Sequence, residues 1–230
     1  MTEYIVIILK AAAAAAAGFL AGHGAVYVFN RMPAEWLCDY GQTPEDELRD
    51  PHIQRIKGFP WKLVFSGMFV CIGINTVLYD WQFAAAAMLF CWAMVIIAAA
   101  DKKYGIIPDQ FVLLAAVSAI GFIPSYGTFM EPVKGLLLGG GIMLLASAAG
   151  RLVFKQDALG FGDVKLFAAI GLAMGGAGTF AVLVMSSLLS AAVFSVMLLR
   201  KKIKRTDSLP LGPYICGCAI FYVAIIVPLL

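Results

Sequence analysis

Charged residues are scarce in this chain. Seventeen Lys and Arg and 14 Asp and Glu make up only 13% of its 230 residues, whereas 62% are hydrophobic. The mean hydropathy is +0.89. A water-soluble core of this size could not bury so much apolar surface. The sequence therefore predicts an integral membrane protein.

Barrel-type strands with alternating polar and apolar residues are also missing. Because only helices and closed barrels satisfy the backbone in lipid, the long apolar runs must be helices. A helix needs roughly 17 to 25 residues to cross a hydrocarbon layer about 30 Å thick. We expect an all-α, polytopic helical membrane protein with about eight transmembrane helices. They lie near residues 5–29, 63–79, 83–100, 110–126, 134–153, 164–176, 179–199 and 211–230. We expect 1–230 to be a single transmembrane domain.

Lys and Arg are nearly absent from every second connection between these spans. They cluster in the other four connections, which are 30–62, 101–109, 151–163 and 200–210. Since cytoplasmic loops carry the excess of positive residues, we expect these four in the cytoplasm and both termini outside. The first apolar segment follows Glu3 rather than a basic cluster, so we expect it to stay as an anchor. The polar stretch 30–62 predicts a solvated cytoplasmic loop rather than a second domain.

Histidine and paired cysteines are rare too. Of five cysteines, only Cys38 lies in the 30–62 loop, and Cys216 and Cys218 are too close in sequence for a zinc ligand pair. We therefore predict no metal site. His23 lies within the first span, where we expect a hydrogen bond to a neighbouring helix. No nucleophile stands beside a base in a known arrangement, and no phosphate-binding glycine loop is present.

Two aspartates remain, at opposite ends of two predicted spans. Asp101 closes the third span in MVIIAAADKKYG, and Asp163 opens the sixth in GFGDVKLF. By the predicted topology, both lie at the cytoplasmic face. Helix capping alone would explain Asp163. Asp101 is at a helix C-terminus, the unfavourable end for an anion, so Lys102 and Lys103 or a catalytic purpose must compensate.

Such a pair suits acid–base chemistry. Two carboxyl groups within a few ångströms cannot both ionise, so they share a proton. In aspartic proteolysis one carboxylate takes a proton from water while the protonated partner donates to the scissile carbonyl. Gly160 and Gly162 would let a substrate backbone approach closely. The alternative is an ion- or proton-coupled membrane transporter that uses Asp101 and Asp163 as intramembrane ligands, although we see no inverted repeat in the hydropathy.

Several strings resemble one known family. GFGDVK resembles the GxGD signature of membrane aspartyl proteases, and D-x₆-P-D over 101–109 resembles the first catalytic aspartate of the prepilin peptidases. VFNRMP at 28–33 and LPLGPY at 209–214 resemble two further strings of that family. Presenilin-type proteases share GxGD, but they have Tyr-Asp and Pro-Ala-Leu motifs that this chain lacks. Over nearly its whole length the chain is similar to the prepilin peptidases, also called type IV leader peptidases.

The resemblance implies an aspartic-type endopeptidase of the bacterial cytoplasmic membrane with its active site facing the cytoplasm. It would cleave the short basic leader of prepilin or pseudopilin precursors, using Asp101 and Asp163 as catalytic residues. Gly160, Gly162 and Lys165 fall on the rest of the motif and would bind substrate. Membrane lipid is the other expected partner, nucleic acid is not one, and proteolysis needs no cofactor.

Methylation is a second activity that the resemblance brings in. Such enzymes often methylate the new N-terminus with S-adenosylmethionine. In that family the first cytoplasmic loop commonly carries two C-x-x-C pairs that are associated with zinc. The loop of this chain has only Cys38, so we expect no zinc there and leave methylation open.

Overall fold

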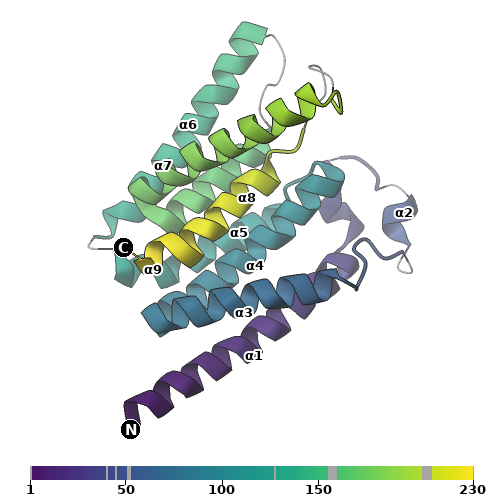
Figure 1. Cartoon of the computed structure of the whole chain (residues 1–230). Coiled ribbons are helices and arrows are strands. Elements are labelled where there is room, and N and C mark those ends of the chain that lie inside the picture. The colour runs from purple at the N-terminus through teal and green to yellow at the C-terminus, as the bar shows by residue number, and fades with distance from the viewer. Residues whose placement is uncertain are drawn as a thin grey trace.

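The chain folds into a bundle of helices in a computed structural model (Figure 1). The structure describes residues 2–39, 41–44, 46–50, 53–126, 128–154, 160–203 and 209–229. Its elements are α1 (Thr2–Arg31), η1 (Ala34–Leu37), α2 (Asp46–Arg49), α3 (Trp61–Tyr79), α4 (Trp81–Tyr104), α5 (Asp109–Ser118), η2 (Ala119–Ser125), α6 (Met130–Phe154), α7 (Phe161–Leu199), α8 (Gly212–Phe221), η3 (Tyr222–Ile226) and α9 (Val227–Leu229). All regular elements of the described residues are helical, which confirms the predicted class of polytopic helical membrane protein.

The predicted number of spans was wrong. Six helices of the described chain are long and apolar enough to cross a membrane, not eight. The predicted span near 110–126 consists of α5, with 10 residues, and η2, with seven residues in a 3₁₀ helix, and is not among these six. The predicted spans 164–176 and 179–199 fall on α7, in which non-helical backbone at Gly175 separates two helical arms.

α7 folds back on itself at Gly175. The backbone there has φ 66° and ψ −175°, a conformation that is essentially restricted to glycine. On the neighbouring helix α6, a Cβ added to Gly139 would lie 2.4 Å from the carbonyl oxygen of Phe167 and 3.0 Å from Cγ2 of Thr179. A straight helix would separate Phe167 from Thr179 by about 18 Å. Both arms of α7 therefore pack near the same point of α6.

α4 is the most buried helix and forms the centre of the bundle. Phe90, Met94 and Ile97 on it have no exposed surface. Phe83 and Phe90 pack edge-on against Phe122 of η2, with ring centroids 5.1 Å and 6.1 Å apart. Such aromatic pairs add stability beyond the area they bury. α4 is thus a well-packed stem whose C-terminal turn carries Asp101.

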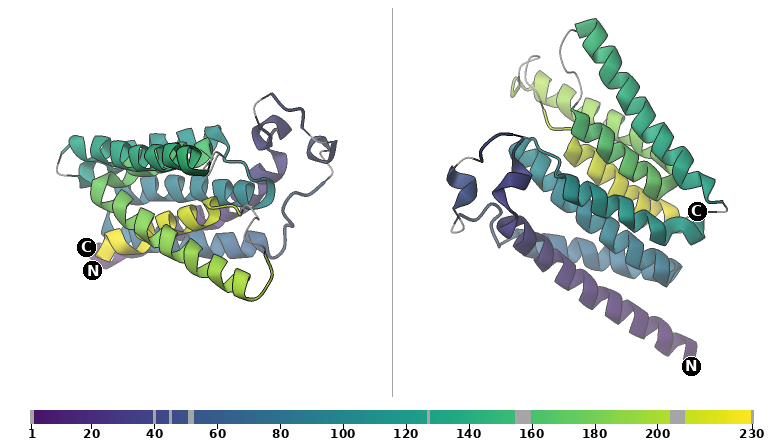
Figure 2. Two further views of the ribbon diagram at one scale, coloured as in Figure 1. Left: turned by 90° about the horizontal axis from the view of Figure 1, so that it is seen from above. Right: turned by 180° about the vertical axis from the view of Figure 1, so that it is seen from behind.

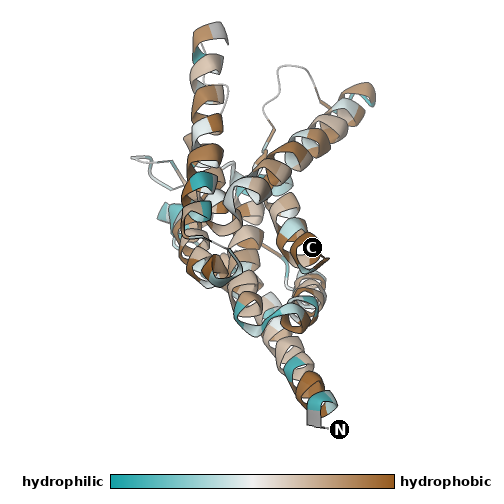
Figure 3. Ribbon diagram, turned by 90° about the vertical axis from the view of Figure 1, so that its left-hand side faces the viewer, coloured by the Kyte–Doolittle hydropathy of each residue, from teal (hydrophilic) through white to brown (hydrophobic). Residues whose placement is uncertain are grey.

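The outer helices carry apolar residues along their length (Figure 3). Leu137, Leu144 and Leu145 of α6 are more than half exposed. An exposed apolar surface of this extent is unfavourable in water and suits contact with lipid.

α1 and α3 cross closely because small residues meet at the crossing. A Cβ on Gly22 would lie 2.2 Å from the backbone nitrogen of Ser66, so only glycine fits there. The neighbouring His23 shares a 2.9 Å hydrogen bond with Oγ of Ser66 through its Nδ1. The prediction that His23 bonds to a neighbouring helix is confirmed.

The first loop, residues 30–62, is tied back to the end of α1. The guanidinium of Arg55 donates a hydrogen bond to the carbonyl oxygen of Met32. Asn30 and Ile56 exchange two hydrogen bonds of 2.9 Å and 2.8 Å between side chain and backbone. The loop is therefore more than the solvated connection that we predicted. It lies at one end of the bundle, and both chain termini lie at the other end (Figure 1, Figure 2).

Candidate active site

Asp101 projects from the last turn of α4. Gly105 ends this helix in a left-handed conformation, with φ 68°, and its N–H donates to the carbonyl oxygen of Asp101. Glycine is the usual residue at such a C-terminus because it has no Cβ penalty. The side chain of Asp101 is buried, with 7% of the residue exposed. Its Oδ2 accepts a 2.8 Å hydrogen bond from the backbone N–H of Gly212.

Asp163 lies in the first turn of α7. Gly160 is the N-cap residue of that helix, and its carbonyl oxygen accepts a 3.1 Å hydrogen bond from the N–H of Asp163. Asp163 is therefore not the N-cap residue of α7, so helix capping does not explain its presence. An acid in the first turn of a helix is still stabilised by the helix dipole. Its side chain is half-buried.

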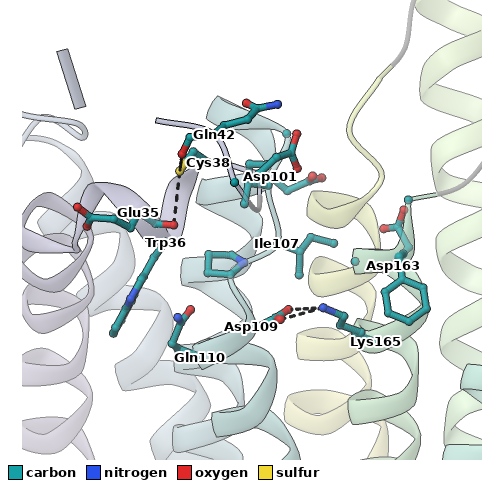
Figure 4. A pocket seen from close by; sticks show the side chains of 18 residues that line it. Glu35, Trp36, Cys38, Gln42, Asp101, Ile107, Asp109, Gln110, Asp163 and Lys165 are labelled. Carbon is teal, nitrogen blue, oxygen red and sulfur yellow. Dashed lines mark hydrogen bonds and ion pairs between the residues drawn. The ribbon is translucent and has the colours of Figure 1, made fainter. Parts of the chain in front are cut away.

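The two aspartates line the same pocket, which has a volume of about 640 Å³. Its other walls come from residues 35, 36, 38, 39, 41 and 42 of the first loop, from 105–110 and from 160–162 and 165. Figure 4 shows the two aspartates on either side of Ile107. Two carboxyl groups that share a pocket can act as acid and base in one reaction.

The three other predicted site residues also lie at this pocket. Gly160 and Gly162 line it, and a Cβ on Gly162 would come within 3.2 Å of the side chain of Ile107. Lys165 lines it too, but its ammonium is bound to both carboxylate oxygens of Asp109, at 2.9 Å and 2.8 Å (Figure 4). All five predicted site residues are thus brought together, and Lys165 has an acidic partner.

Asp109 was not among the predicted site residues. Asp109 is the first residue of α5 and lines the pocket. The D-x₆-P-D spacing could have identified it, because Pro108 extends the backbone before α5 and sets where that helix begins.

The wall that the first loop contributes, with residues 35, 36, 38, 39, 41 and 42, was also missed. The ring of Trp36 packs edge-on against Phe111 of α5, with centroids 6.3 Å apart, and Leu37 is buried. The thiol of Cys38 donates to the carbonyl oxygens of Glu35 and Gln42 and so closes the turn. Trp36 and Leu37 were the available signal in the sequence, because two adjacent large apolar residues in a polar loop indicate that part of the loop is buried.

Metal ligation is not supported by the geometry of the described residues. Within them, no group of three or more His, Cys, Asp or Glu could hold a metal ion. The carboxylates of Asp101, Asp109 and Asp163 come from three separate helices, and that of Asp109 is bound to Lys165 (Figure 4). The arrangement instead resembles what direct acid–base chemistry on a bound substrate requires.

Comparison with known proteins points to one family. Residues 88–196 match the type IV leader peptidase family. A protein of Xanthomonas campestris pv. campestris named prepilin leader peptidase/N-methyltransferase is 31% identical over 150 residues, which cover 63% of this chain and 51% of that protein. Proteins with the same name from Aeromonas salmonicida and Pseudomonas aeruginosa are each 28% identical, over 56% and 60% of this chain and 45% and 48% of their own length.

The chain therefore spans about half the length of the relatives it matches. No solved structure matches it significantly. The matched segment contains Asp101 at the end of α4 and Asp163 at the start of α7. Across residues 88–196, the chain is similar to the type IV leader peptidase family.

Proposed function

We propose that this chain is a membrane aspartyl endopeptidase that removes the short basic leader of type IV prepilin-like precursors. The observation that carries the proposal is the shared pocket of Asp101 and Asp163, which come from two helices of the segment matching the family. Their order and their places at helix ends agree with a two-aspartate acid–base mechanism.

The chemistry needs only these two groups and water. One carboxylate takes a proton from a water molecule, whose oxygen attacks the carbonyl carbon of the scissile peptide bond. The other, protonated, carboxyl group donates its proton to the carbonyl oxygen. The tetrahedral intermediate then collapses and the C–N bond breaks. The leaving nitrogen takes the proton that the first carboxyl group had received from water, and the second carboxylate regains a proton from a hydroxyl group of the intermediate. Each carboxyl group thus returns to its starting state.

The charge of the pocket supports a basic substrate. Besides the two catalytic aspartates, it is lined by the carboxylates of Glu35, Asp39 and Asp109. The one cation among the described lining residues, Lys165, is bound to Asp109. A pocket with such an excess of negative charge attracts and orients a cationic peptide segment.

The place of the pocket in the bundle supports an interfacial reaction. Asp101 is in the last turn of α4 and Asp163 in the first turn of α7, so both lie at helix ends. Transporters of the alternative class bind their ions near the middle of the membrane. With the basic connections on its side, the pocket would face the cytoplasm of a bacterial cytoplasmic membrane. In a precursor whose leader directly precedes an apolar helix, the cleavage site would lie at the membrane surface, at the depth of this pocket.

Methyl transfer is a separate question. The names of the relatives include N-methyltransferase, which favours a second activity with S-adenosylmethionine. The 30–62 loop has one cysteine, Cys38, and the described residues contain no candidate metal cluster, so the zinc associated with this loop in the resembling family does not fit here. We derive no methyl-transfer step from this chain.

A cleavage assay tests the proposal. Purified protein incubated with a prepilin-like precursor should release the leader just ahead of the apolar helix, and mass spectrometry of the product shows whether a methyl group is added. No cleavage, combined with a proton or cation flux in liposomes that depends on Asp101 and Asp163, would favour the transporter instead.

A further inference from the structure

α8 begins directly against the side chain of Asp101. Gly212 is the first residue of this helix, and its N–H donates the 2.8 Å hydrogen bond to Oδ2 of Asp101. The bond is buried. It joins residues that are 111 positions apart, from the C-terminus of α4 to the N-terminus of α8.

The N–H of Gly212 is available because of how α8 starts. The first N–H groups of any helix lack partners within the helix. Pro213 has no N–H, and the N–H groups of Tyr214 and Ile215 already donate to the carbonyl oxygen of Leu211, at 3.0 Å and 3.1 Å. The N–H of Gly212 therefore points out of the helix toward Asp101. The positive end of the α8 dipole strengthens this interaction with a carboxylate.

Only glycine fits at position 212. A Cβ there would lie 2.6 Å from Oδ2, 2.8 Å from Cγ and 2.9 Å from Cβ of Asp101. All three distances are shorter than real Cβ contacts, and the short aspartate side chain has no flexible end that could move aside. The absence of a side chain at Gly212 is what allows the backbone of α8 to reach the carboxylate.

We propose that Gly212 is a positioning residue of the aspartyl peptidase site. Its N–H holds Oδ2 of Asp101 as a hydrogen-bond acceptor and fixes the plane of the carboxylate. Because Asp101 also lines the pocket, Oδ1 is the oxygen left for water and the shared proton. The catalytic part of this inference rests on the proposed function, whereas the contact itself does not.

The test compares Gly212→Ala with Gly217→Ala in the full-length protein. Gly217 is on the same helix, and a Cβ there meets nothing within 4 Å. For Gly212→Ala we expect kcat to fall at least about tenfold with KM within about twofold, since substrate is still bound while Asp101 is displaced. The acidic limb of the kcat profile should move to higher pH, because the carboxylate loses a donor that stabilises its charged form. Gly217→Ala should behave like the wild type.

Thermal unfolding of a second set of variants tests the contact without catalysis. Gly212→Ala should lower the melting temperature in the wild-type background and much less in an Asp101→Ala background, where two of the three clashing atoms are gone. An active Gly212→Ala with a wild-type pH profile would overturn the inference. So would a loss of stability that Asp101→Ala does not relieve. If the wild type itself cleaves no precursor, the proposed function fails. The melting temperatures of the four proteins still test whether Gly212 contacts Asp101.

Discussion

At the scale of single residues, the contacts of Asp101 show how a carboxylate at a helix C-terminus is stabilised. A carboxylate at the C-terminus of α4 faces the negative end of that helix dipole. Lys102 and Lys103, one of the two ways of compensation that we considered, are exposed, and the ammonium of Lys103 donates to the carbonyl oxygen of Arg55. The N–H of Gly212 compensates instead. The motif identified the acid, but no periodicity or spacing in the sequence could reveal a partner 111 residues away.

The two glycines of the GFGD string make a residue-scale prediction. Gly160 has φ −67° and ψ 142°, which any residue can adopt, and a Cβ there meets only Oδ2 of Asp163, at 3.7 Å. We expect Gly160→Ala to cost less than about 1 kcal/mol of stability but to lower kcat/KM about tenfold, because the methyl group stands where the substrate backbone must pass. Gly24→Ala, in open space on α1, is the control. Unchanged kinetics would show that the substrate backbone does not pass close to Gly160.

At the scale of elements, the pocket forms where the ends of several helices meet. The C-terminus of α4 and the N-termini of α5, α7 and α8 converge on it, and η1 closes one side. Apolar run length predicted where helices lie, because hydrophobic side chains must face lipid or the core. It could not predict the backbone conformation of Gly175, at which α7 folds back, since a glycine in an apolar run is compatible with both a straight and a folded helix.

The fold-back of α7 predicts an effect on stability. Gly175 has space for a Cβ, whose nearest atoms would be 3.5 Å away, so the cost of Gly175→Ala is backbone strain rather than a clash. We expect a loss of about 1 to 3 kcal/mol in unfolding free energy, measured by denaturant unfolding in detergent. Gly67→Ala in α3, where a Cβ meets nothing within 4 Å, should change stability far less. Equal effects of the two substitutions would contradict the role of the backbone conformation at 175.

The ion pair between α5 and α7 gives a second prediction at this scale. Lys165 and Asp109 are 2.8 Å apart, with 31% and 37% of their side chains exposed. We expect Lys165→Gln and Asp109→Asn each to lower kcat/KM about threefold, and the double variant to do no more, because each removes the same link. Initial rates of leader cleavage measure this cycle. An effect of Lys165→Gln on KM that Asp109→Asn lacks would mean that the lysine binds substrate directly.

At the scale of the whole molecule, the fold separates the reacting end from the termini. The predicted topology placed the basic connections on one side, and the first loop lies at the end opposite to both termini (Figure 1, Figure 2). The helical class, the family and the grouping of all five predicted site residues followed from composition and motif. The contribution of the first loop to the pocket could not be predicted in this way, because its position depends on tertiary contacts such as that of Trp36 with Phe111.

Cysteine labelling tests this topology. Lys57 is exposed in the first loop, and Gln82 is exposed at the start of α4, near the other end. In a background in which Cys38 and Cys71 are serine, a cysteine at 82 should react with a membrane-impermeant maleimide in intact spheroplasts. A cysteine at 57 should react only after the cells are opened. The reverse pattern would place the pocket outside the cell.

The central claim is that Asp101 and Asp163 act as one catalytic unit, and the most direct test is the rate of leader cleavage by Asp101→Asn, Asp163→Asn and the double variant. Thermal unfolding must first show that all three are folded. Because either substitution removes the acid–base pair, each single variant should lose at least about a thousandfold in kcat/KM, and the double variant should lose no more. Appreciable turnover by either single variant, or a double loss equal to the product of the single losses, would contradict the account.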